Sequence, residues 1–122
     1  MRLYVIGPVT GREKLNQEAF EDAKERLLDA GYDVLIPHDV VPPDAVHERA
    51  MRLSIKAMLG CDGVAALTDW DESRGAKLER EVAVACGIEI HCVDTWLLMA
   101  DALLRAICEE IATLARSNPA HW

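Results

Sequence analysis

The chain has 122 residues, 51% of them apolar, and a net charge of −8 from 21 acidic and 13 basic side chains. This length suits one domain with a single core, and no apolar run approaches the roughly 20 residues that span a bilayer. The acidic balance argues against a nucleic-acid polymer as partner, because such binding depends on many Lys/Arg–phosphate contacts. The first apolar run is too short for a signal peptide, so we expect a cytoplasmic protein with no membrane partner.

Strands and helices alternate along the predicted chain. Short apolar runs bounded by glycine or proline, and apolar residues at helical spacing, mark the two kinds of element. The strands are expected at 3–6, 33–36, 63–67 and 87–93, and the helices at 16–30, 46–59, 74–86 and 95–116. The sequence therefore predicts one α/β domain over residues 1–122, with a small doubly wound (Rossmann/flavodoxin-like), mostly parallel sheet of four to five strands and flanking helices.

The helix predicted at 95–116 carries more apolar residues than one sheet face requires. One apolar stripe consists of Leu97, Leu104, Cys108 and Ile111. Further apolar residues lie outside this stripe: Leu98, Met99 and Leu103. A deeply buried helix would account for this pattern too. We expect a subunit interface instead, and hence a homodimer or a larger homo-oligomer.

The four cysteines form no CxxC pair, and in a cytoplasmic chain they are expected to be reduced. Cys86, His91 and Cys92 lie close together in sequence and could suggest a metal. Because they fall where a helix ends and a strand begins, we expect them to pack in the core. No metal and no organic cofactor is predicted.

Ligands of open parallel sheets bind beyond the carboxyl ends of the strands. Three predicted strands lead there into residues 7–11, 37–39 and 68–73. The first loop contains Gly7, Pro8 and Gly11, so its backbone could approach a ligand closely. A plain turn explains this loop equally well.

The helix predicted at 74–86 begins with Ser73, which is placed to cap it, followed by Arg74, Gly75 and Ala76. The free N–H groups and the dipole at a helix amino terminus attract anions. Ser73 could also be an ordinary N-cap without a ligand.

Glu79 lies on the face of this helix that should meet the sheet. At 100° per residue that face also contains Gly75, Leu78, Val82, Ala83 and Cys86. A carboxylate there is costly unless it is paired or has a purpose. A structural ion pair with an arginine is the alternative to a functional role.

These same residues carry a family resemblance over about residues 2–93. The pattern is Tyr4-x-x-Gly7-Pro8-x-x-Gly11, then Gly31-Tyr32-x-Val34, Asp62-Gly63-Val64 and Ser73-Arg74-Gly75-Ala76-x-x-Glu79, with Ala83 and Gly87-Ile88. It resembles the nucleoside 2-deoxyribosyltransferase superfamily, in particular a phage and bacterial branch of uncharacterised small proteins.

The resemblance implies an enzyme in which Glu79 is the nucleophile that attacks the anomeric carbon and Tyr4 positions the nucleophile or the sugar. The transferases of the superfamily have an aspartate at the position of Ser73, whereas the deoxynucleoside monophosphate N-glycosidases have a serine that binds the phosphate. In this respect the sequence resembles the N-glycosidases. A nucleotide or nucleoside is thus the expected small-molecule partner. Its binding residues are expected to be Gly7, Pro8, Gly11, Ser54, Ser73, Arg74, Gly75 and Ala76.

Ser54 departs from the family pattern, which has an aspartate eight residues before the position of Asp62. That aspartate assists sugar binding and departure of the base, and serine cannot supply a proton in the same way at neutral pH. Asp39 or Asp69 could substitute for it. Otherwise turnover is slow, or the chain is a catalytically weakened nucleotide-binding module that binds nucleotides without cleaving them. A pure assembly protein is a third reading, which the inward Glu79 disfavours.

Overall fold

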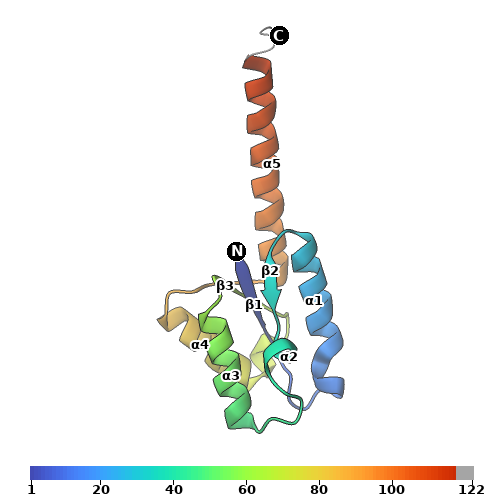
Figure 1. Cartoon of the computed structure of the whole chain (residues 1–122), viewed down its shortest axis with the longest axis vertical. Coiled ribbons are helices and arrows are strands. Elements are labelled where there is room, and N and C mark those ends of the chain that lie inside the picture. The colour runs from blue at the N-terminus through green and yellow to red at the C-terminus, as the bar shows by residue number, and fades with distance from the viewer. Residues whose placement is uncertain (118–122) are drawn as a thin grey trace.

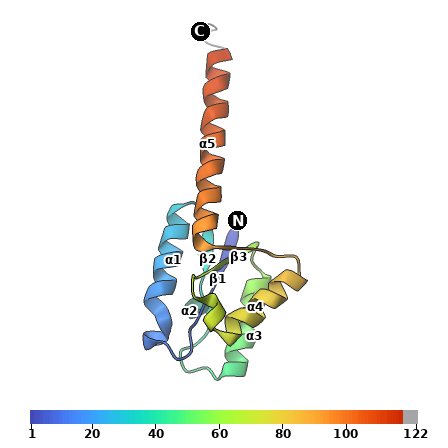
Figure 2. The same ribbon diagram turned by 180° about the vertical axis from the view of Figure 1, so that it is seen from behind.

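The computed structural model describes residues 1–117, in which a parallel sheet lies between two layers of helices (Figures 1 and 2). The four strands are β1 (Arg2–Ile6), β2 (Asp33–Leu35), β3 (Gly63–Ala66) and β4 (Glu89–Cys92), in the order β2-β1-β3-β4. The helices are α1 (Gln17–Asp29), α2 (Pro37–Val40), α3 (His47–Leu59), α4 (Arg74–Ala85) and α5 (Val93–Ser117), with short turns η1 (Glu13–Asn16) and η2 (Trp70–Glu72). The predicted α/β fold is confirmed.

Alternate residues of the strands point to opposite faces of the sheet and make two cores. On one face, Leu3 and Val5 pack with residues of α1 and with Trp96 at the base of α5. On the other face, Tyr4 and Ile6 pack with residues of α3 and α4. Both faces are covered, which explains why the central strands are almost continuously apolar.

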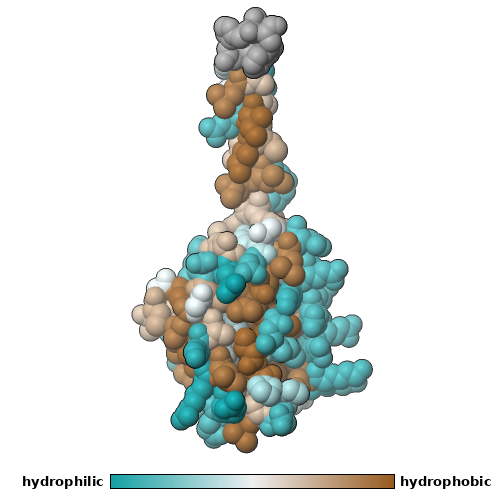
Figure 3. All heavy atoms as spheres, in the orientation of Figure 1, coloured by the Kyte–Doolittle hydropathy of each residue, from teal (hydrophilic) through white to brown (hydrophobic). Residues whose placement is uncertain are grey.

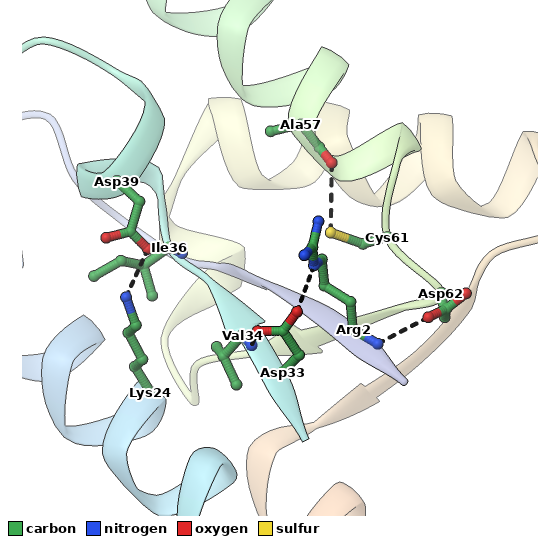
Figure 4. A network of polar contacts seen from close by, with 9 residues as sticks. All are labelled: Arg2, Lys24, Asp33, Val34, Ile36, Asp39, Ala57, Cys61 and Asp62. Atoms are coloured by element: carbon green, nitrogen blue, oxygen red, sulfur yellow. Dashed lines mark hydrogen bonds and ion pairs between the residues drawn. The ribbon is translucent and has the colours of Figure 1, made fainter. Parts of the chain in front are cut away.

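A small polar network connects the amino-terminal ends of the strands (Figure 4). The Arg2 side chain donates to Asp33 over 2.8 Å, and the Arg2 backbone N–H donates to Asp62, also over 2.8 Å. These contacts join the start of β1 to the first residue of β2 and to the residue that precedes β3. Exposed pairs of this kind contribute little stability. We therefore interpret them as contacts that help to set the register of the strands.

Helix α4 is rotated relative to its predicted orientation. Its buried residues are Ala76, Glu79 and Ala83, whereas Leu78 is 45% exposed and Cys86 is exposed. The inward position of Glu79 is confirmed, but the predicted apolar arc was centred too close to Leu78. The small residues allow α4 to lie close to the sheet, and Leu78 lies at the edge of that contact.

The expected core packing is wrong for Cys86 and Cys92, and His91 shows it only in part. Cys86 follows the last turn of α4 and is exposed, and Cys92 lies on the edge strand β4 and is also exposed. His91 is partly buried, with its ring edge-on to Trp96 at 5.0 Å. A strand at the sheet edge has one unpaired side, which sequence periodicity does not reveal.

Helix α5 packs on the domain only through its first turns. Val93 and Trp96 are buried and Leu97 is partly buried, whereas every residue from Asp101 to Ser117 is exposed. The helix therefore projects away from the sheet, as Figures 1 and 2 show. The predicted stripe that includes Leu104 does not pack on the sheet. In residues 1–117 no helix is long and apolar enough to cross a membrane.

Candidate functional site

A cavity of about 380 Å³ lies at the carboxyl ends of β1, β2 and β3. The loop after β1, the α2 segment, one face of α3 and the first turns of α4 form its walls. This is the edge at which ligands of parallel α/β sheets bind, and the volume lies within the 300–1,000 Å³ usual for small-molecule sites. Among the predicted binding residues, the wall contains Gly7, Pro8, Ser54, Ser73, Arg74, Gly75 and Ala76.

The two glycines of the first loop have different environments. A Cβ on Gly7 would come within 2.6 Å of the Leu67 side chain, so a larger residue there would displace Leu67, and Gly7 also lines the cavity. Gly11 is exposed, has a φ of +81° and does not line the cavity. The structure therefore gives Gly11 a role in the turn and places no ligand surface on it.

The amino terminus of α4 opens onto the cavity. The Ser73 hydroxyl accepts a hydrogen bond from the Ala76 N–H over 3.1 Å, so the predicted N-cap is confirmed. A helix leaves its first N–H groups without intrahelical partners, and within the described residues those of Arg74 and Gly75 have no protein acceptor. A Cβ on Gly75 would lie 3.1 Å from the Met51 sulfur, so a larger residue there would crowd the wall.

Glu79 is the charged residue at the base of the cavity, and it is 5% exposed. The Ser54 hydroxyl donates to Glu79 Oε2 over 2.5 Å. Tyr4 Oη lies 2.6 Å from Ser54 Oγ, and because the serine proton is directed at Glu79, the tyrosine is the donor when Glu79 is ionised. The three side chains come from β1, α3 and α4 and form one buried chain of hydrogen bonds.

Burial has the largest effect on the pKa values of the two ionisable residues in this hydrogen-bond chain, Glu79 and Tyr4. Removal from water raises the pKa of Glu79 to about 7, and the hydrogen bond from Ser54 acts in the opposite direction. Burial and the neighbouring Glu79 charge also raise the pKa of Tyr4 well above its usual range. Glu79 therefore changes from its protonated to its ionised form near neutral pH, whereas Tyr4 stays protonated.

The arginine partner considered for Glu79 does not exist among the described residues, where Ser54 contacts its carboxylate instead. Arg12 lines the cavity but is paired with Glu72 at 2.6 Å and with Asp69 at 3.2 Å. Arg74 is exposed at the wall and has no such pairing in the described chain. It is the cation best placed to meet an anionic ligand.

Neither candidate substitute acid reaches the cavity wall. Asp39 accepts from the Ile36 N–H over 3.0 Å and from the Lys24 ammonium over 2.9 Å (Figure 4), so it closes the turn after β2. Asp69 is held by Arg12 outside the wall. Glu79 and Glu72 are the acidic residues of the wall.

Two histidines line the cavity although the sequence analysis assigned no role to them. His47 begins α3, and His38 lies in α2 directly after β2. His38 Nε2 bonds to the Leu15 carbonyl over 2.8 Å, and its Nδ1 is the buried side-chain atom without a partner in the described chain. The position of His38 directly after a strand was the sequence feature that could have placed it in the cavity wall. Within residues 1–117 no three His, Cys, Asp or Glu side chains cluster as metal ligands do.

The fold and this cavity define an α/β protein with a cavity at the carboxyl ends of the strands of a parallel sheet. Residues 1–92 match the family model described as "Domain of unknown function (DUF4406)", and the chain belongs to this family. Helix α5 begins just beyond the matched residues.

The chain is also similar to the solved structure of a 2-deoxyribosyltransferase from the psychrotolerant bacterium Bacillus psychrosaccharolyticus, described as a biocatalyst for the synthesis of antiviral and antitumoral nucleosides. The two share 15% sequence identity and a TM-score of 0.57, over 74% of this chain and 69% of that one. The expected resemblance in fold is thereby confirmed. A search of curated proteins found no match.

Proposed function

We propose that this chain is an N-glycosidase, or a deoxyribosyltransferase-like enzyme, that cleaves the base–sugar bond of deoxynucleoside 5′-monophosphates with Glu79 as nucleophile. The observation that carries the proposal is a buried carboxylate at the base of a nucleotide-sized cavity, held by Ser54 and beside the amino terminus of α4. A structural carboxylate would be expected to have a cationic partner. Glu79 has a hydroxyl instead.

The proposed reaction has two steps. A Glu79 carboxylate oxygen bonds to C1′ of the sugar as the C1′–N bond breaks, and the electron pair leaves with the base, which takes up a proton. Water then attacks C1′, displaces Glu79 and loses a proton, which balances the proton gained by the base. The products are the free base and deoxyribose 5-phosphate. A second base in place of water would give transfer.

The phosphate is proposed to lie at the amino terminus of α4. The N–H groups of Arg74 and Gly75 are free to donate there, and the Arg74 side chain adds a positive charge. Ser73 contributes a hydroxyl to the same wall. An aspartate in its place would repel the phosphate.

A catalytically weakened nucleotide-binding module is the second candidate, and Ser54 favours it. Ser54 occupies the place of the acid that the resemblance leads us to expect, and neither Asp39 nor Asp69 lines the cavity. Such a module would bind deoxynucleotides and leave the glycosidic bond intact.

The test is to incubate the protein with a panel of deoxynucleosides and their monophosphates, and to measure free base by chromatography and binding by calorimetry. We expect base release from monophosphates. Release should fall by several orders of magnitude in Glu79→Gln, because no nucleophile remains.

The matched control is Glu81→Gln, an exposed glutamate on the same helix, which should keep the wild-type rate. Binding without release by the wild type would favour the second candidate. Wild-type activity in folded Glu79→Gln would exclude the proposed nucleophile.

A further inference from the structure

The projecting part of α5 exposes apolar side chains on a helix that nothing else in residues 1–117 covers. Leu104, Ile111 and Leu114 are 60, 61 and 62% exposed, and Ile107 is 46% exposed. Figure 3 shows apolar side chains as a brown column along this helix, above the more mixed surface of the domain. Contiguous exposed apolar surface of this kind marks an interaction site.

The apolar residues follow a seven-residue repeat. Six positions, spaced alternately by three and four residues, are Leu97, Ala100, Leu104, Ile107, Ile111 and Leu114. We call these six residues the seam. Apolar residues at this spacing pair one helix with another in a coiled coil. The seam spans about 26 Å of helix at 1.5 Å per residue.

The lower part of the seam continues into a groove at the amino-terminal end of the sheet. The groove has a volume of about 790 Å³. Its walls include Met1, Gly31 and Tyr32 of the domain together with Leu97, Ala100, Leu104 and Ile107 of the seam. The free helix and the groove thus form one continuous surface.

We propose that a second copy of this chain covers this surface, with its α5 antiparallel to the first, so that each helix tip occupies the groove of the other protomer. In this register Leu97 faces Leu114, Ala100 faces Ile111, and Leu104 faces Ile107. Every seam residue has a partner, and the smallest faces a larger one. The spacing is symmetric about a point between Leu104 and Ile107, as a two-fold interface requires.

The groove and the charges favour this orientation over a parallel pair. An antiparallel partner would bring only its helix tip to the groove, whereas a parallel partner would bring its whole domain there. Residues 93–117 contain four acidic and two basic side chains, so six of the eight net negative charges lie in residues 1–92. Antiparallel pairing separates those charges, and parallel pairing places them together.

The number of residues on this surface is close to that of a standard dimer interface. Fourteen residues line the groove. Five more complete the upper seam and its flanks: Cys108, Glu110, Ile111, Leu114 and Ala115. Together these approach the roughly 20–30 residues per side of a standard interface.

Light scattering at tens of micromolar tests the pairing. Wild type should have the mass of a dimer, and Leu104→Asp, which places a charge at the centre of the seam, should have the mass of a monomer. Leu98→Asp is the matched control, because Leu98 is 68% exposed and lies outside the seam, and it should remain a dimer. A monomeric wild type, or a dimer that survives Leu104→Asp, would overturn the proposal.

Disulfide formation tests the orientation. In the antiparallel pair Asp101 lies beside the partner's Cys108, so Asp101→Cys should cross-link to it on mild oxidation. Leu103→Cys would lie beside the partner's Cys108 in a parallel pair and on the far side of the seam in an antiparallel one. Peptide mapping distinguishes the two. A cross-link in Leu103→Cys and none in Asp101→Cys would exclude the antiparallel arrangement.

Discussion

At the scale of single residues, Glu79 experiences two opposing influences on its pKa. Burial raises the pKa to about 7, and the Ser54 hydroxyl lowers it by donating to the ionised form. A nucleophilic carboxylate has to be ionised, so the proposed activity should increase as pH rises through this range. The same group links the stability of the fold to pH.

The first prediction concerns that linkage. The pKa of Glu79 is raised from 4.5 to about 7 on folding, so the folded state holds the proton more tightly than the unfolded state between these values. Stability from this group is fully present below about pH 4.5 and declines until about pH 7, by about 3 kcal/mol in total. Glu79→Gln removes the titration.

The Tm of Glu79→Gln relative to wild type should therefore increase between pH 5 and pH 8, by on the order of 10 °C. Thermal unfolding followed by circular dichroism at both pH values measures it. Glu81→Gln, on the exposed face of α4, should show little change in either condition. A Tm difference for Glu79→Gln that is the same at both pH values would contradict the buried, proton-exchanging carboxylate.

A second prediction concerns Ser54. Ser54→Ala removes the hydrogen bond that lowers the pKa of Glu79, so this pKa should rise further. Hydrogen bonds to charged groups contribute about 1.5–3 kcal/mol, which corresponds to about one to two pKa units. Base release at pH 7 should fall about tenfold or more and recover at higher pH.

A pH–rate profile is the measurement. Tyr4→Phe is the comparison variant, because it leaves the Ser54–Glu79 bond intact and should displace the profile less. An unchanged profile in Ser54→Ala would show that this hydroxyl does not control the ionisation of Glu79.

At the scale of elements, α4 carries both the proposed nucleophile and the proposed anion site. Ser73 caps its amino terminus, and Glu79 lies near the middle on the buried face. The helix dipole and the free N–H groups therefore lie at one end of the cavity and the carboxylate at its base. This separation suits a ligand with a phosphate at one end and a reactive carbon further along.

A third prediction separates the cap from the ligand preference. Ser73→Asp keeps a good N-cap, so Tm should change by only a few degrees. A carboxylate about 5 Å from a phosphate costs on the order of 3 kcal/mol at an effective dielectric of 20, which corresponds to about 100-fold weaker monophosphate binding. Nucleoside binding should be affected much less.

Calorimetry with a deoxynucleoside and its monophosphate measures this difference. Ser73→Ala is the control, because it loses the cap, at about 1 kcal/mol of stability, and adds no charge. Equal weakening of both ligands in Ser73→Asp would place the phosphate elsewhere.

At the scale of the whole molecule, the cavity and the α5 surface lie at opposite ends of the sheet. The cavity is at the carboxyl ends of the strands, and the groove is at their amino ends, beside Met1 and Gly31. The two share no lining residue. Pairing through α5 would therefore leave the cavity open, and monomeric Leu104→Asp should keep the nucleotide binding that we propose for the wild type.

The sequence by itself determined the order of strands and helices, the parallel sheet and the inward position of Glu79. These follow from local periodicity, because strands and helices that alternate along the chain form a parallel sheet with helices on its faces. The carboxyl-edge location of the cavity follows from the same rule. The Ser73 cap is likewise a local property of the chain.

Only the tertiary structure decided which neighbours these residues have. The Tyr4–Ser54–Glu79 chain joins three elements that are far apart in sequence, and His38 enters the cavity wall through the turn after β2. The exposure of Cys92 depends on β4 being an edge strand. Helix α5 leaves the domain after its first turns, and its periodicity alone could not distinguish a sheet partner from a second helix, because both bury an apolar stripe.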